Sequence, residues 1–119
     1  MRTQTAIAAF SALAHTHRLA IYRLLVEQGP QGLPAGVIGE RIGLLPSSLT
    51  FHLQNLRRAG LIRQRRLSRQ LIYSADFEAM NELVGYLTEN CCAVSGGSCA
   101  AASPALRSRS GSRRAVKVA

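Results

Sequence analysis

Residues 44–74 have the sequence LLPSSLTFHLQNLRRAGLIRQRRLSRQLIYS, which changes halfway along from a helical pattern to an extended one. In the first half, Leu49, Leu53 and Leu56 fall on one side of a helix that advances about 100° per residue. Gly60 is a natural end for this helix, and the short polar turn between LIRQRRL and LIYS predicts a two-stranded hairpin. A helix that is followed by a basic hairpin is typical of a DNA-binding winged helix-turn-helix.

The positive charge of the chain is concentrated in the same stretch. The whole sequence has 15 Lys and Arg against 6 Asp and Glu, which gives a net charge of +9. Residues 41–75 contain seven arginines and no acid. Such a field attracts polyanions, and the phosphate backbone of double-stranded DNA is the default partner, whereas the alternative is a solvated basic face. In the context of a helix and a hairpin, the charge predicts a nucleic-acid partner.

The outward side of the predicted helix holds the candidates for reading bases. In helix-turn-helix proteins the N-terminal half of the second helix enters the major groove, where side chains meet base edges. The predicted base readers are Ser47, Ser48, Thr50, Phe51 and Gln54. For Phe51 the alternative is contact with a neighbouring loop.

Arginines at the end of the helix and along the hairpin are the candidates for contacting phosphates. Phosphate contacts position a protein on DNA without carrying sequence information, and they suit long cationic side chains. The predicted phosphate ligands are Arg57, Arg58, Arg65, Arg66 and Arg69. The alternative is that these arginines only keep an edge of the protein soluble.

Apolar residues at helical spacing predict four further helices, over residues 3–14, 17–28, 34–42 and 76–90. Thr16 is the predicted N-cap of the second helix. Pro34 suits the first turn of the third helix, and Gly43 ends it. The last helix has an apolar stripe that core and dimer contacts would share, formed by Phe77, Met80, Leu83, Val84 and Leu87.

Two motifs occur together in the chain: S-x-T-F-H-L-x-x-L-x-x-A-G-L-I in residues 48–62 and LAHTHRLAIYRLL in residues 13–25. The pair resembles the ArsR family of metal-responsive bacterial repressors, and the resemblance covers roughly residues 9–99. It implies a mainly α winged helix-turn-helix with a small β-hairpin wing. It also implies a homodimer on a palindromic operator, with the first helix in the dimer interface. The ending YLTENCC, with Cys99 after it, is similar to arsenite-responsive members that keep their cysteines after the last helix.

The chain departs from the family pattern at three places. The segment LPAGVIGERIG has no cysteine or histidine, so the Cys-x-Cys sensing pair of many members is absent. The segment MNELVGYLTEN has no histidine, which argues against zinc sensing on the last helix. The hairpin tip lacks the glycine that is usual in the family, so its turn type stays open.

Three cysteines at the end of the last helix form the candidate metal site. Cys91 and Cys92 are adjacent, and Cys99 follows a segment that contains Gly96 and Gly97. On a continuous helix Cys92 and Cys99 would stand ~10 Å apart, too far to share an ion, but the glycines permit a loop that folds back. Three soft thiolates suit a three-coordinate ion, so the predicted inducer is As(III) or Sb(III). The alternatives are a redox-active thiol cluster and incidental thiols.

The histidines are assigned no chemistry. His15 and His17 are separated by one residue, but the sequence shows no further ligand near them, so solvent-exposed histidines at a helix start are expected. His52 falls beside the leucine stripe and is predicted to be a half-buried structural histidine. None of the three is placed in the metal site.

One domain over residues 1–99 and a disordered basic tail over residues 100–119 are predicted. No apolar run approaches the ~18 residues of a membrane span, and the N-terminus does not resemble a signal peptide, so a cytoplasmic protein is expected. The sequence lacks a phosphate-cradling loop and a Cys-x-x-Cys pair, which argues against a thiol enzyme such as an arsenate reductase. The predicted function is repression of arsenic-resistance genes with release by metalloid. The alternative is a repressor of the same fold that senses thiol oxidation.

Overall fold

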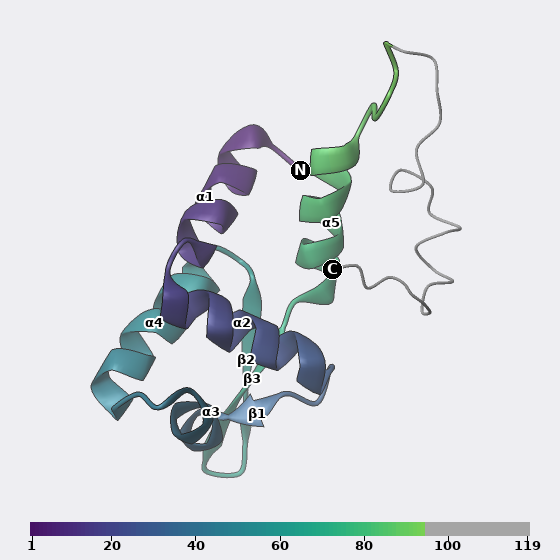
Figure 1. The fold of residues 1–119 in the computed structure, drawn as a ribbon. Helices are drawn as coiled ribbons and strands as arrows, with labels where there is room; N and C mark the ends of the chain where they lie inside the picture. The colour runs from purple at the N-terminus through teal and green to yellow at the C-terminus, as the bar shows by residue number, and fades with distance from the viewer. Residues whose placement is uncertain (95–119) are drawn as a thin grey trace. The chain divides into compact units, whose positions relative to one another are not determined.

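Residues 1–94 are described by the computed structural model (Figure 1), and the chain divides into two units, Met1–Leu83 and Val84–Ala119. The described elements are the helices α1 (Thr3–Leu13), α2 (Thr16–Gln28), α3 (Ala35–Ile42), α4 (Pro46–Arg58) and α5 (Phe77–Thr88) and the strands β1 (Leu33–Pro34), β2 (Ile62–Leu67) and β3 (Gln70–Ala75). This mostly helical architecture with a small antiparallel sheet confirms the predicted fold class. No helix among the described residues combines the length and the apolar character that a bilayer span requires. The predicted boundary after residue 99 lies outside the described residues.

The predicted helices are confirmed, but the N-terminus of α2 is capped by a different residue than predicted. Thr16 is the first residue of the helix, and His15 before it has an extended backbone, with φ −158° and ψ 134°. The backbone N–H of His17 donates to Nδ1 of His15 at 3.1 Å. An imidazole nitrogen therefore fills the role that the sequence analysis gave to the threonine hydroxyl, because the extended residue is the one whose side chain can reach the first turn.

The ends of the other helices follow from local chemistry. Pro34 precedes α3 instead of lying in its first turn, because its extended backbone places it in β1. Gly43 ends α3 as predicted, with φ 84° in the left-handed region. α5 is shorter than predicted: it begins after Asp76, whose Oδ1 accepts a hydrogen bond from the Ala79 N–H at 3.1 Å, and it ends at Thr88.

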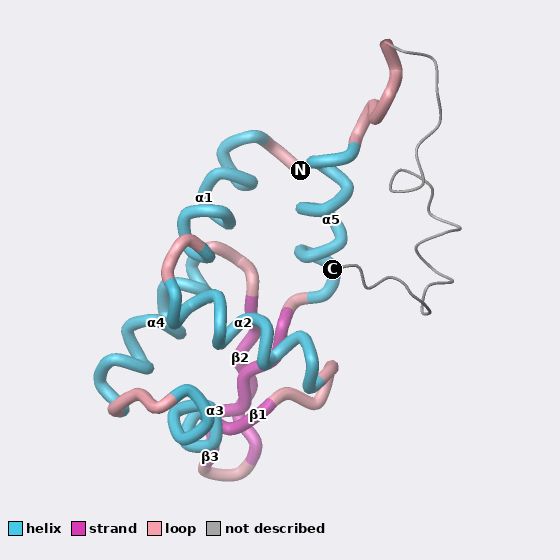
Figure 2. The backbone as a smooth tube through the Cα atoms, viewed as in Figure 1, coloured by secondary structure: helices cyan, strands magenta, loops and turns pink. Residues whose placement is uncertain are grey.

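The three strands pair in the order β1-β3-β2, all antiparallel (Figure 2). The hairpin of β2 and β3 was predicted, but β1 was not, because two residues are too short to show an alternating pattern. The last pair before the turn is Leu67 with Gln70. Ser68 has φ 60°, and Arg69 is not among the residues with positive φ. Because a type I′ turn needs positive φ at both central residues, positive φ only at the first excludes that type for this hairpin.

The core of Met1–Leu83 is built around α2, which contacts α1, α3, α4 and β3 (Figure 1). The stripe predicted for α4 is confirmed, since Leu49, Leu53 and Leu56 are all buried. Ile21 and Leu25 of α2 are fully buried as well. α4 is thereby held by its apolar side, and its opposite side is left in solvent.

Tyr22 places its hydroxyl group in the core, where polar groups normally need a hydrogen-bond partner. Its hydroxyl group is buried and has no hydrogen-bond partner within the described part of the chain. Burial, with a smaller contribution from the negative charge of Asp76, raises the pKa of Tyr22 above its ordinary value. The folded state therefore favours the neutral phenol, so stability is lost as the pH rises past the unfolded value of about 10.

Tyr22→Phe is expected to raise the free energy of unfolding by about 1 kcal/mol, since the desolvated hydroxyl is removed and no hydrogen bond is broken. It should also make the loss of stability above about pH 10 shallower. Urea denaturation followed by circular dichroism measures both effects. The matched control is Tyr73→Phe, which should be destabilising because the Tyr73 hydroxyl accepts a hydrogen bond from Gln64 Nε2 at 2.7 Å. Equal effects of the two changes would contradict the assignment.

Candidate nucleic-acid interface and thiol pair

The solvent side of α4 presents all five predicted base readers. Every one of them is exposed: Ser47, Ser48, Thr50, Phe51 and Gln54. Pro46 is the first helical residue, a position where the missing N–H has no helical partner to lose. Phe51 keeps 58% of its surface exposed, which is high for a phenyl ring. This exposure does not favour the alternative in which Phe51 packs on a neighbouring loop.

The C-terminal half of the same surface is cationic. Gln54, Arg57 and Arg58 together line a shallow hollow of about 350 Å³. The two arginines also lie in the last turn of α4, where positive charge is favourable next to the helix C-terminus. An amide and two guanidinium groups around one hollow can hold a negatively charged, hydrogen-bonding partner such as a phosphate.

Two of the four arginines on the hairpin, Arg63 and Arg65, form side-chain hydrogen bonds with other parts of the protein. Arg63 is paired with acids, since its Nε donates to Asp76 Oδ2 at 3.2 Å and its Nη2 lies 4.0 Å from Glu78 Oε1. Arg65, a predicted phosphate ligand, donates from Nη2 to the backbone carbonyl of Gln31 at 2.7 Å. Its guanidinium therefore also ties the wing to the segment before β1, a role that the sequence pattern did not show.

Arg66 lies near the end of β2, and Arg69 is in the hairpin turn. Both are exposed, and within residues 1–94 neither side chain makes a hydrogen bond or an ion pair. A guanidinium without a partner in the protein keeps its donors for a ligand. These two side chains are the strongest candidates on the wing for contacting phosphates.

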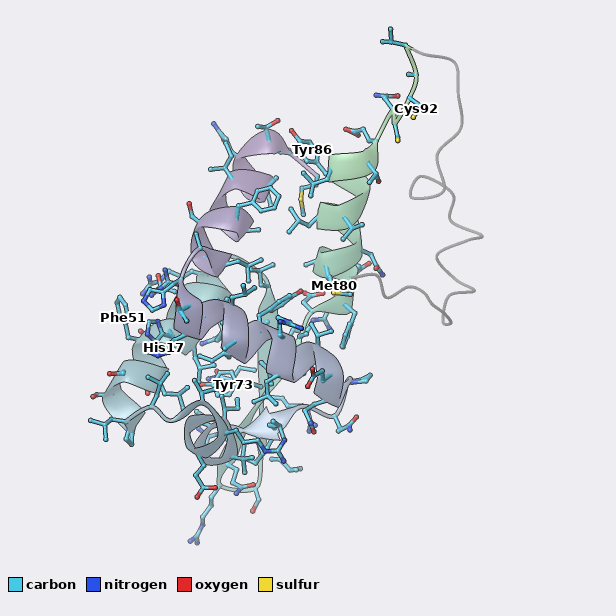
Figure 3. All side chains as sticks on the ribbon, viewed as in Figure 1. His17, Phe51, Tyr73, Met80, Tyr86 and Cys92 are labelled. Carbon is cyan, nitrogen blue, oxygen red and sulfur yellow. The ribbon has the colours of Figure 1, made fainter. Side chains whose placement is uncertain are left out.

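The three histidines of the chain, which the sequence analysis kept apart, converge in space. His15 and His17 stand at the start of α2, and His52 lies in the middle of α4. The ring centroids are 4.6 Å apart for His15 and His52 and 5.7 Å apart for His17 and His52. Figure 3 shows His17 and Phe51, the neighbour of His52, on the same side of the molecule. The sequence reasoning missed this cluster because a contact between two helices leaves no mark in local spacing.

His52 is more buried than expected, with 7% of its surface exposed. Burial lowers the pKa of His52 below its ordinary value, and the nearby charges of His15, Arg18 and His17 lower it further. Nη1 of Arg18 lies 3.3 Å from His52 Nδ1, and Nε of Arg18 donates to the Ala12 carbonyl at 2.7 Å. Arg18 thus links the C-terminal turn of α1 to α4.

The candidate metal site is described only in part. Cys91 is half-buried and Cys92 is exposed, and their sulfur atoms lie 3.6 Å apart. Adjacent residues of a helix point about 100° apart. Here the helix has already ended, and both Asn90 and Cys92 have positive φ, of 61° and 62°. The two thiols therefore lie in a turn after α5 and do not follow helical geometry. Cys99 and the predicted tail of residues 100–119 lie outside the described residues.

The chain is similar to known regulators of transcription. A family model described as a helix-turn-helix domain matches residues 13–65. The HTH-type transcriptional regulator YgaV of Escherichia coli is 33% identical over 89 residues, which are 75% of this chain and 88% of YgaV. Among solved structures, HlyU from Vibrio cholerae is 30% identical, with a TM-score of 0.58 and coverage of 73% of this chain and 97% of HlyU. Reduced HlyU from the same organism is 31% identical, with a TM-score of 0.57 and coverage of 71% and 90%.

An ArsR-like transcriptional regulator from a Rhodococcus species has a similar fold. Its TM-score is 0.63, and the match covers 76% of this chain and 82% of that protein. At 23% identity, the likeness supports the winged fold alone.

Proposed function

This chain belongs to the winged helix-turn-helix transcriptional regulators of the ArsR and HlyU type, and from that premise we propose how it acts. It is a homodimeric repressor that leaves its operator when As(III) or Sb(III) binds its C-terminal cysteines. The thiol ligands in this proposal are Cys91, Cys92 and Cys99. The observation that carries the proposal is the 3.6 Å separation of the Cys91 and Cys92 sulfur atoms.

That separation suits one shared ion. Two thiolates bound at about 2.3 Å, with an angle between a right angle and the tetrahedral value, stand roughly 3.3–3.8 Å apart. Cys91 and Cys92 are already within this range, so little rearrangement is needed to bind the first two sulfurs. Cys99 follows seven residues later, and a segment of that length reaches at most about 24 Å, enough to return a third sulfur to the pair.

The DNA-binding part of the proposal places α4 in the major groove. The exposed serine, threonine, phenylalanine and glutamine side chains of its outer face would meet base edges there. Arg66 and Arg69 next to the wing turn would contact phosphates beside the site. Because phosphates give affinity and base edges give sequence preference, the two sets of residues have different expected phenotypes.

Dimerisation is supported by apolar side chains that are left in solvent. Ile7 and Phe10 on α1 are 58% and 40% exposed, and on the last turns of α5 Val84 and Leu87 are 41% and 61% exposed. Burying such side chains against a second copy is favourable. A two-fold dimer also matches the symmetry of a palindromic operator. A metalloid bound just after α5 would favour a dimer whose α4 helices no longer match the half-site spacing, and operator binding would in turn weaken metalloid binding.

A second candidate function is a thiol-redox switch on the same fold. One relative has been solved as reduced HlyU, and the sulfur atoms of Cys91 and Cys92 are close enough to interact. In that reaction two thiols would lose two electrons and two protons and form a disulfide, while a peroxide oxidant would be reduced to water or an alcohol.

Mass spectrometry of the intact protein separates the two functions. Under arsenite with a reductant present, the mass should rise by one arsenic atom and fall by the hydrogens of the thiols that bind it. Under peroxide, the redox switch would lower the mass by two hydrogens and release DNA without any metalloid. Release by peroxide, with no arsenic adduct and no release under arsenite, would replace the metalloid proposal by the redox one.

Gln54→Ala is expected to lower operator affinity by about 1–3 kcal/mol at one or two base pairs, the usual value of one good bidentate base contact. Fluorescence anisotropy on operators selected from random duplexes, each with one base pair changed, gives the position-specific loss. The matched control is Asn55→Ala, because the Asn55 amide donates to the Phe51 carbonyl of the same helix at 2.9 Å. A loss that is uniform over all operator variants would mean that Gln54 positions the protein and does not read a base.

A further inference from the structure

The histidine cluster offers a ligand set that the proposed function does not use. One ring nitrogen from each of His15, His17 and His52 can be chosen so that all three lie within 4.8 Å of one another. We propose that these three histidines bind a divalent transition-metal ion that favours imidazole ligands, such as Zn²⁺. The bound ion would link α4 to the start of α2. This site is separate from the cysteines and does not rest on the metalloid proposal.

The geometry needs only small movements to close around an ion. Zn²⁺ binds imidazole nitrogen at 2.0–2.1 Å, so the nitrogens of a tetrahedral site stand roughly 3.3 Å apart. His15 and His17 are accessible to solvent, and rotation of their side chains can move the ring nitrogens by the missing ~1.5 Å. His52 is held by its burial in α4 and forms the fixed point. Three imidazoles leave a fourth position for water, as in three-histidine zinc sites.

Hydrogen bonds within the protein explain the positions of the His15 and His52 rings but not that of the His17 ring. His15 caps α2 through Nδ1, and His52 faces Arg18. The ring of His17 makes no hydrogen bond within residues 1–94, yet it stands 5.6 Å from the ring of His15. With Nδ1 of His15 bound to the His17 N–H, its Nε2 is the nitrogen left for an ion.

Metal binding would change what holds α4. A guanidinium only donates, so the His52 Nδ1 that faces Arg18 at 3.3 Å must offer its lone pair. An ion on Nδ1 would take that lone pair directly. An ion on Nε2 would leave the proton on Nδ1, which could then no longer accept. In either case His52 exchanges its contact with Arg18 of α2, which is anchored on the Ala12 carbonyl of α1, for an ion held by His15 and His17 at the start of α2. Because the buried His52 follows the exposed Phe51 directly, the ion would stabilise α4 on the side away from its exposed face.

The test uses full-length protein with all three cysteines changed to serine, so that the thiols cannot compete for the ion. The chain has only three histidines, so the long-range ¹⁵N–¹H spectrum of its imidazoles contains three ring systems. At one equivalent of Zn²⁺, all three should shift together and then stop changing. A shift of the His15 and His17 rings alone would overturn the three-ligand site, and so would no saturation below about millimolar Zn²⁺.

His17→Ala supplies the second arm, because its ring makes no hydrogen bond in the described structure and its loss should leave the fold intact. Affinity for Co²⁺, read from the visible absorption of the ion, should fall at least ~10-fold when one of three ligands is removed, because losing even a hydrogen-bond partner of a metal ligand typically lowers metal affinity by about 10–100-fold. The matched control is Thr16→Ala, which lies between the two histidines and keeps all three rings. Unchanged Co²⁺ affinity in His17→Ala, with circular dichroism confirming the fold, would place the ion elsewhere.

Discussion

Arg66→Ala/Arg69→Ala is expected to weaken binding to every DNA duplex by roughly 10²–10³-fold in the proposed dimer, because each phosphate contact contributes about 1 kcal/mol at 0.15 M salt through counterion release. Both guanidinium groups are exposed next to the wing turn and make no ion pair within the described residues. The slope of log affinity against log salt should fall by about 3.6 for the four contacts of a dimer. Sequence preference should survive, since phosphates carry no base information.

The matched control for this pair is Arg63→Ala on the same hairpin. Arg63 is held by Asp76 at 3.2 Å and lies near Glu78, so it should contribute little to DNA affinity or to the salt slope. Fluorescence anisotropy at several salt concentrations measures all three proteins on one operator and one unrelated duplex. A double variant that keeps its affinity but prefers a different operator would show that the wing reads bases.

Gly32→Ala is expected to lower the free energy of unfolding by at least about 3 kcal/mol, which is the range for backbone strain combined with a steric clash. Gly32 has φ 69°, a conformation that costs any L side chain. An added Cβ would also collide with the Tyr73 carbonyl oxygen, and it would lie 2.9 Å from the carbonyl carbon and 3.0 Å from Ser74 Cβ. The obstacle is mainly backbone of β3, which cannot move without breaking its pairing with β1.

Gly43→Ala separates the clash from the backbone strain. Gly43 has φ 84°, but nothing lies within 4 Å of a Cβ built on it. Its replacement should cost only about 1 kcal/mol, the usual penalty for a left-handed alanine. Urea midpoints of the two variants give the comparison. Equal losses would mean that β3 yields to the added methyl group and that the approach of residue 32 to Tyr73 is not rigid.

The helices and the hairpin could be predicted because their patterns are local. The spacing of Leu49, Leu53 and Leu56 already defines which side of α4 is buried, and the same periodicity predicts which residues face solvent. Gly43 likewise ends its helix through its own backbone freedom. The conformations of these segments depend on neighbours along the chain, which a sequence displays.

The features that were missed depend on contacts between distant segments. Arg65 and Arg66 look alike in the sequence, and only the position of the Gln31 carbonyl distinguishes them. The histidine cluster requires α2 to cross α4 at a particular place, which no spacing rule supplies. β1 becomes a strand only because β3 lies beside Leu33. The N-cap of α2 was missed because the usual preference for Ser, Thr, Asp or Asn at that position favoured Thr16. The backbone is extended at His15 instead, so the histidine side chain caps the helix.

The third thiol has its own expected phenotype. Inorganic As(III) can bind three thiolates, whereas a mono-organic arsenical has only two positions for them. Cys99→Ser should therefore lose much of the response to inorganic As(III) and keep the response to the organic ligand through Cys91 and Cys92. Allosteric couplings are typically about 1–3 kcal/mol, so the loss of one ligand of three can remove the response even where some binding persists.

Release of operator DNA during an As(III) titration, followed by fluorescence anisotropy, tests the sensing proposal most directly. Wild type and Cys91→Ser/Cys92→Ser should bind the operator with equal affinity before metalloid is added, because the two thiols follow the end of α5 and lie outside α4 and the wing. Wild type should then leave the DNA as As(III) is added, while the double variant should stay bound at the same concentrations. If the double variant leaves the DNA at the same As(III) concentration as wild type, Cys91 and Cys92 are not the sensor.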